Sequence, residues 1–229
     1  MVLEIPERHV PELPLTVRWP EGGLSLGRAQ IVDGLWERQG RYITTREPGY
    51  DRLIAIGDVA WRDYEVTVPV VVHGINPAAY ETASVHTGVG LVMRWKGHSR
   101  WNPDGRATGQ PRHGPVPYGA IAWWTTWPDE RGANLNLFDV DLVPREITPR
   151  HLQTDVPYIF RARVVTVGGG RSRYSLKVWP EGTPEPERWH LSTVAPVNAL
   201  ETGSLLLAAH ETTASFGPVT IVPGVDSGC

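Results

Sequence analysis

Two alternating runs of residues separated by three glycines constrain the fold of this chain most. Apolar and polar side chains alternate in residues 158–167 and again in 173–179, which is the period of a β-strand with one buried face. Gly168, Gly169 and Gly170 between them can supply the positive φ angles that a tight reversal needs. The sequence therefore predicts a β-hairpin. Its predicted core side chains are Tyr158, Phe160, Val164, Tyr174, Leu176 and Val178.

The rest of the chain also favours strands. Its 21 prolines and 24 glycines are scattered, so that few windows are long enough for a helix. Residues 149–155 form one turn of helix at most. Short runs bounded by turn residues predict strands at 15–19, 35–36, 42–45, 53–57, 63–72, 88–96, 118–127, 134–140, 203–209 and 214–222. We expect the last two runs to form a hairpin around residues 210–213.

The run 63–72 shows the clearest alternation, with Tyr64, Val66, Val68, Val70 and Val72 on one face. Pro69 lies on the other face and has no N–H to donate. We therefore expect it beside a bulge, or with its missing donor facing no partner.

Many short strands without helices between them predict an all-β fold, a two-sheet antiparallel sandwich. A single domain over residues 1–229 is the simplest organisation, with 1–14 as an irregular N-terminal arm. The window 97–117 contains Trp101 and His113 and lies between two strong strands. We therefore predict that this window is a long packed or functional loop within that domain.

Three short patterns around the hairpin resemble a known family. They are Tyr158-x-x-Arg161-x-Arg163, Lys177-Val178-Trp179-Pro180-x-Gly182 and Glu185-Pro186-x-x-Trp189, with a similar closing strand at 214–219 and a weaker similarity at 61–66. They resemble the laminin-G-like branch of the concanavalin A-like lectin/glucanase superfamily. The resemblance implies a jelly-roll sandwich, a role in carbohydrate recognition or adhesion, and a place in a secreted or cell-surface protein.

The choice of aromatic residues is consistent with sugar binding. The chain has 10 tryptophans and only 3 phenylalanines. Indole combines a flat face, suited to the C–H surface of a pyranose, with an N–H donor. Trp123 and Trp124 are consecutive, so on a strand one enters the core and the other faces a surface. Together with Trp95, Trp101 and Trp127 they lie in one tryptophan-rich segment, and its tryptophans are either core aromatics or a sugar-stacking surface.

Charged side chains on the outward faces of the strong strands suggest a second surface. Arg161, Arg163 and Lys177 alternate with the core residues of the hairpin, as does Glu65 in its own strand. If they lie on one sheet, they would form a basic face able to bind acidic or hydroxyl-rich glycans. The alternative is that these charged side chains only solvate the face of the sheet. The predicted ligand-binding residues are Arg94, Lys96, His98, Trp101, Trp124, Trp127, Arg163, Lys177 and Trp179.

Charge and composition exclude several other classes of partner. The net charge is −3 with both signs mixed along the chain, so no basic surface for nucleic acid is predicted. No apolar run is long enough for membrane insertion. Residues 1–17 lack the apolar core of a signal peptide. We expect either a cytoplasmic protein or part of a longer secreted product, and the oligomeric state stays open.

A polysaccharide-cleaving enzyme is the main alternative to a binding domain. The Glu-x-Asp-x-x-Glu pattern of retaining glucanases is absent, and Asp139, Asp141 and Glu146 are a poor substitute. A uronate lyase is the stronger of the two enzyme alternatives. Its candidate residues are Arg94, His98, His113 and Tyr118, with Gln110, although their spacing does not match the lyase motifs. A structural or assembly domain without a small ligand is the third possibility.

No cofactor is required by the sequence. Cys229 is the only cysteine, which excludes internal disulfides and cysteine metal clusters. Proteins that the chain resembles hold Ca²⁺ with loop carbonyls and a lone carboxylate, so Ca²⁺ is a candidate ion. Its candidate donors are Asp58, Asp63, Asp104 and Asp129. The leading hypothesis is a non-catalytic domain that binds a polysaccharide or other glycan through tryptophan stacking and charged hydrogen bonds.

Overall fold

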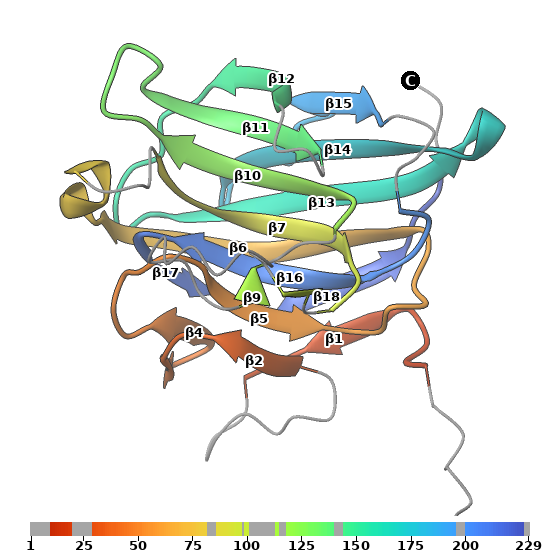
Figure 1. The fold of residues 1–229 in the computed structure, drawn as a ribbon, viewed down its shortest axis with the longest axis horizontal. Coiled ribbons are helices and arrows are strands. Elements are labelled where there is room, and N and C mark those ends of the chain that lie inside the picture. The colour runs from red at the N-terminus through yellow and green to blue at the C-terminus, as the bar shows by residue number, and fades with distance from the viewer. Residues whose placement is uncertain are drawn as a thin grey trace, which may run out of the picture.

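The computed structural model describes residues 10–19, 29–81, 86–97, 99–100, 113–114, 118–139, 144–195 and 200–226. These residues form two large antiparallel sheets that pack face to face, one behind the other in Figure 1. The fold is therefore the predicted all-β sandwich. No helix in the described part of the chain is long and apolar enough to cross a membrane.

Sheet A contains the hairpin. Its strand order is β15 (Leu191–Val194), β14 (Arg171–Pro180), β13 (Pro157–Val167), β6 (Tyr64–Ile75), β17 (Thr212–Phe216), β4 (Tyr42–Thr45) and β3 (Trp36–Gln39). β18 (Val219–Pro223) pairs with β6 and with β1 (Leu15–Val17).

Sheet B has seven strands. Their order is β12 (Pro144–Pro149), β11 (Ala133–Asp139), β10 (Ala120–Thr126), β7 (Thr87–Trp95), β16 (Ser204–His210), β5 (Arg52–Ile56) and β2 (Ala29–Asp33). The remaining elements are the two-stranded β8 (Ser99–Arg100) and β9 (His113–Gly114), and the short 3₁₀ turns η1 (Pro77–Glu81) and η2 (Gly168–Gly170).

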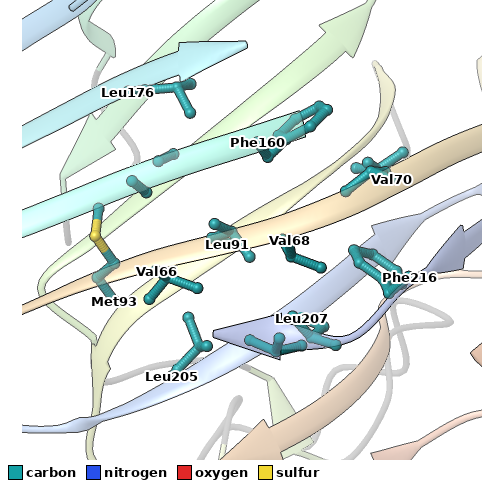
Figure 2. Close-up of a cluster of buried hydrophobic side chains, with 14 of the residues drawn as sticks. Val66, Val68, Val70, Leu91, Met93, Phe160, Leu176, Leu205, Leu207 and Phe216 are labelled. Atoms are coloured by element: carbon teal, nitrogen blue, oxygen red, sulfur yellow. The ribbon is translucent and has the colours of Figure 1, made fainter. Parts of the chain in front are cut away.

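The main core lies between the two sheets. Alternate residues of β6 and of the hairpin point from sheet A toward alternate residues of β7 and β16 in sheet B. Figure 2 shows part of this layer: Val66, Val68, Val70, Leu91, Met93, Phe160, Leu176, Leu205, Leu207 and Phe216. The period-2 pattern of each strand therefore selects the face that the strand buries.

The predicted hairpin and its core face are confirmed. β13 and β14 pair from Tyr158 opposite Pro180 to Val167 opposite Arg171. Gly169 and Gly170 have φ angles of 73° and 70°, so the reversal uses the conformation that glycine adopts without strain. All six predicted core side chains are at most 7% exposed.

Pro69 lies where β6 changes its neighbour. β17 pairs with β6 as far as Val70, and β18 begins its pairing at Thr67. The carbonyl of Pro69 accepts a hydrogen bond from the N–H of Gly217, at 2.7 Å, in the link between those two strands. Since N and O of a strand residue point to the same side, the missing donor of Pro69 faces this gap, as expected.

The prediction for the last two runs is wrong. β16 and β17 do not pair with each other, because β16 lies in sheet B between β5 and β7 and β17 lies in sheet A beside β6. The chain crosses from one sheet to the other at Glu211, whose φ of 49° makes a sharp corner. The run 214–222 is likewise divided into β17 and β18, and residues 149–155 form no helix.

Besides the two-residue β8 and β9, the sequence-based prediction omits three strands of the two large sheets, β2, β12 and β15. Each is the outermost strand of its sheet path. Edge strands of this kind are held by backbone pairing along one side more than by a buried face, so their side chains need not alternate.

Candidate functional site

The outer face of sheet B carries a second buried cluster, separate from the core between the sheets. The consecutive tryptophans of β10 divide between the two. Trp124 points into the main core, and its Nε1–H donates to the carbonyl of Arg150 at 2.9 Å. Trp123 lies on the outer face but is only 5% exposed. Trp124 is the predicted ligand-facing residue, whereas the structure places Trp123 on the outer face.

Five rings on this face form what we call the aromatic–imidazole cluster. Its members are His86, Trp123, Trp127, Phe138 and His210. The His86 ring is 4.8 Å from Trp123, 4.7 Å from Trp127 and 5.0 Å from His210, between ring centroids. The rings of Trp123 and Phe138 meet edge to face at 5.6 Å. Such contacts hold the rings in fixed orientations.

Four neighbouring strands of sheet B, β11, β10, β7 and β16, position the cluster. β10 supplies Trp123, β11 supplies Phe138 and β16 ends on His210, while His86 directly precedes β7. Gly90 lies opposite Trp123 in the β7–β10 register. A Cβ at position 90 would lie 2.1 Å from the Cβ of Trp123, so this glycine makes room for the indole.

His210 is oriented by a carboxylate. Its Nδ1 lies 2.9 Å from Oδ1 of Asp51, and the two side chains are 6% and 13% exposed. Since a carboxylate only accepts hydrogen bonds, Nδ1 carries the hydrogen. The ring of Tyr50 packs edge-on against His210 at 4.7 Å. Burial raises the pKa of Tyr50, so its phenol stays protonated.

The cluster contains buried polar atoms without a partner. Both ring nitrogens of His86 and the Nε1–H of Trp123 are buried and make no hydrogen bond to the described residues. Burial, followed by the nearby His210 and Arg131, lowers the pKa of His86 to about 3. The imidazole is therefore neutral near pH 7, with one N–H donor and one acceptor nitrogen.

Trp127 forms the partly exposed border of the cluster. Its Nε1–H donates to Oγ1 of Thr125 at 3.2 Å, and Asn136 donates to the same oxygen at 2.6 Å. The guanidinium of Arg131 lies 3.7 Å from the centroid of the indole ring. Arg131 is held by Asp129 at 2.8 and 2.9 Å, and its side chain is 51% exposed.

The expected basic face exists on sheet A, but it is not open. Arg161, Arg163 and Lys177 share the outer face of β13 and β14. Nη1 of Arg161 donates to both carboxylate oxygens of Glu185 at 2.7 Å, and Lys177 pairs with the same carboxylate. The ring of Trp189 lies 4.7 Å from the guanidinium of Arg163 and 5.0 Å from Nζ of Lys177.

The segment that carries Glu185 and Trp189 therefore covers this face and neutralises much of its charge. Arg163, Lys177 and Trp179 are each 7% exposed. Alternation along each strand correctly predicts that these side chains point away from the core. It does not reveal that residues just after β14 fold back over them.

Arg94 is buried rather than displayed. It is 0% exposed and reaches from sheet B to the elements of sheet A. Its guanidinium donates to Asp63 at 3.1 Å, to the carbonyl of Leu200 at 2.7 Å and to the hydroxyls of Thr166 and Ser172. The expectation failed because Arg94 has a φ of 55°, which interrupts the strand alternation.

The other predicted site residues are dispersed. Lys96 is exposed, and its Nζ donates to the carbonyl of Val59 at 3.3 Å. Tyr118 is 0% exposed within the buried cluster on the outer face of sheet B. Arg94 and Tyr118, members of the proposed lyase set, therefore do not converge. His98, Trp101, Asp104 and Gln110 lie outside the described residues, and for His113 only the backbone is described.

Each candidate calcium ligand among the described residues already accepts a hydrogen bond from the protein. Asp58 accepts from the N–H of Ala60 at 2.8 Å, Asp63 accepts from Arg94 and Thr166, and Asp129 is paired with Arg131. Within the described ranges, no group of three or more His, Cys, Asp or Glu side chains is placed to hold a metal ion.

Sheet A also carries a chain of hydrogen-bonded side chains that was not predicted, because its residues are far apart in the sequence. Oδ1 of Asp155 lies 2.7 Å from Nδ1 of His73, and Nε2 of His73 lies 2.7 Å from Oγ of Ser215. Ser215 also bonds to Thr44 at 2.7 Å and is only 3% exposed. Its hydroxyl is therefore enclosed by two partners, unlike an accessible nucleophile.

Comparison with solved structures identifies the fold as that of the concanavalin A-like lectins. The exoplasmic/lumenal domain of VIP36, with Ca²⁺ and Man2 bound, matches with a TM-score of 0.59 and 13% sequence identity, over 93% of this chain and 89% of that chain. The seed lectin of Lotus tetragonolobus matches with a TM-score of 0.57 and 6% identity, over 92% and 97% of the two chains.

The acidic lectin of winged bean, in complex with methyl-α-D-galactose, matches with a TM-score of 0.55 and 9% identity, over 91% of this chain and 97% of that chain. No protein-family model and no curated protein sequence matches the chain. The concanavalin A-like part of the predicted resemblance is thus confirmed at the level of the fold. The laminin-G-like branch is not.

Proposed function

We propose that this protein is a non-catalytic carbohydrate-binding domain that holds glycan on the outer face of sheet B. The observation that carries the proposal is the aromatic–imidazole cluster, in which rings suited to sugar stacking surround polar atoms of His86 and Trp123 that have no described partner. The shared fold supports it, since VIP36 has been solved with mannose-containing ligands and winged bean lectin with a galactoside.

Trp127 is the residue of this face best placed to meet a sugar ring. It is the partly exposed tryptophan of the cluster, and its N–H is already used by Thr125, which leaves its apolar face for stacking. Arg131, which covers that face, is half exposed and can be displaced by a pyranose. Of the predicted ligand-binding residues, Trp127 therefore remains in the proposed site, and His86 and Trp123 are added to it.

The described residues favour binding over catalysis. Arg94 is enclosed by structural hydrogen bonds and Tyr118 is buried elsewhere, so they offer no proton-transfer pair to a uronate. The three described candidate Ca²⁺ donors, Asp58, Asp63 and Asp129, already accept hydrogen bonds from donors of the protein. The proposed mode of binding therefore uses no metal ligand from the described residues.

Replacement of Trp127 by alanine tests the proposal. We expect a loss of glycan affinity of about tenfold or more, because a lost aromatic contact costs on the order of 1 kcal/mol beyond the lost area. The measurement is retention on a panel of neutral and acidic glycans, followed by titration with the best ligand. Trp189→Ala is the matched control, since Trp189 is also partly exposed but lies on sheet A.

Two results would contradict the proposal. If the wild-type protein retains no glycan of the panel, the domain is not a carbohydrate-binding one. If Trp189→Ala weakens binding and Trp127→Ala does not, glycan binds to sheet A and the proposed face is wrong.

A further inference from the structure

The geometry points to His86 and Trp123 as the polar contacts of a neutral, hydroxyl-bearing sugar residue, in preference to an acidic one. This inference rests on the proposed function and adds the chemical class of the ligand. It follows from three features of the outer face of sheet B: the buried polar atoms, their hydrogen-bonding character, and the charges around them.

The first feature is the set of three buried polar atoms. Nδ1 and Nε2 of His86 and Nε1 of Trp123 have no described hydrogen-bond partner, and Trp123 is 5% exposed. A buried polar group left without a partner costs about 1–3 kcal/mol. Folded proteins rarely keep such groups unless water or a ligand satisfies them. Here all three atoms belong to two rings whose centroids are 4.8 Å apart, so one ligand that displaces the side chains over the cluster would contact them together.

The second feature is the hydrogen-bonding character of these atoms. Neutral His86 offers one N–H and one acceptor nitrogen, and Trp123 offers one N–H. A sugar hydroxyl donates and accepts, so two neighbouring hydroxyls satisfy all three atoms. A carboxylate only accepts, and it would leave the acceptor nitrogen of His86 without a donor.

The third feature is the lack of an available positive charge. Burying a carboxylate requires a paired cation. Arg131, the nearby arginine, is already bonded to Asp129, and His210 donates to Asp51. Arg161, Arg163 and Lys177 lie on sheet A. Among the described residues, the charges near the cluster therefore favour a ligand without a negative charge.

His86→Phe tests the inference, because it removes both nitrogens and keeps an aromatic ring. Calorimetric titration would use the methyl α-glycosides of mannose, galactose and glucose beside those of glucuronic and galacturonic acid. We expect wild-type protein to bind at least one neutral glycoside about tenfold more tightly than either acidic one, and the variant to bind it at least about tenfold more weakly. We also expect no fall in the melting temperature, since an apolar ring needs no hydrogen bonds there.

A second variant keeps the inference testable if His86→Phe does not fold. Trp123→Phe removes the indole N–H and retains a ring, and it should also weaken binding, whereas Trp189→Phe, on sheet A, should not. If no glycoside or glycan binds, the proposed function itself fails. If glycan binds but both cluster variants bind normally, or acidic glycosides bind more tightly than neutral ones, only this inference fails. A lower melting temperature for His86→Phe with unchanged binding would show that water fills the site.

Discussion

Replacing Arg94 by methionine should lower the free energy of unfolding by about 3 kcal/mol, the lower end of the usual cost of breaking a buried ion pair, because its partner Asp63 is 32% exposed. The guanidinium is 0% exposed and bonds to Asp63, to the carbonyls of Arg62 and Leu200 and to two hydroxyls. Methionine fills part of the volume but donates to none of these acceptors. The acceptors that are shielded from water then have fewer partners, which is the larger part of the cost.

Urea denaturation followed by tryptophan fluorescence measures this effect. Lys96→Met is the matched control, because Lys96 is exposed two residues further along the chain, and it should change stability by about 0.5 kcal/mol or less. A loss below about 1 kcal/mol for Arg94→Met would show that the network contributes little. Folded Arg94→Met protein that still binds glycan would confirm that Arg94 has no direct role in the ligand site.

The second large effect is a loss of stability in acid that depends on His86. Burial lowers the pKa of this imidazole from 6.5 to about 3 in the folded protein. Below about pH 6.5 the unfolded chain takes up a proton at this position while the folded chain does not. The unfolded state then binds more protons, so the free energy of unfolding falls as the pH falls, until His86 is protonated in both states. Each unit of pKa difference corresponds to about 1.4 kcal/mol.

Comparison with His86→Phe isolates this contribution. All other ionisable groups are the same in the two proteins, so the difference in unfolding free energy between them reports the missing imidazole. Between about pH 4 and 7 this difference should shift steadily in favour of the variant as the pH is lowered. Parallel curves for the two proteins over this window would mean that His86 is not buried as a neutral group.

Much of the fold could be predicted because strand patterning is a local property. The alternation in residues 158–167 and 173–179 correctly identified both strands of the hairpin and the faces that they bury. The same reasoning placed alternate residues of β6 in the core. It failed at Arg94 and Glu211, whose positive φ angles break the period or turn the chain, and such angles leave little trace in the sequence when the residue is not glycine.

The candidate site was predictable only in part. Trp127 could be chosen from the tryptophan-rich segment. His86 and His210 could not, because they are separated by more than a hundred residues and meet only when β7 and β16 become neighbours. The one local signal was that both lie at strand ends, where polar residues are common.

By itself, the sequence determined most of the strands, the faces that β6 and the hairpin bury, and the class of fold, because these depend on residue spacing within about ten positions. Tertiary structure decided which strands pair, which of Trp123 and Trp124 faces outward, and that Glu185 and Trp189 close the basic face of sheet A. It also created the aromatic–imidazole cluster. The physical reason is that pairing and burial depend on contacts between distant segments, and a strand's own period is compatible with several partners.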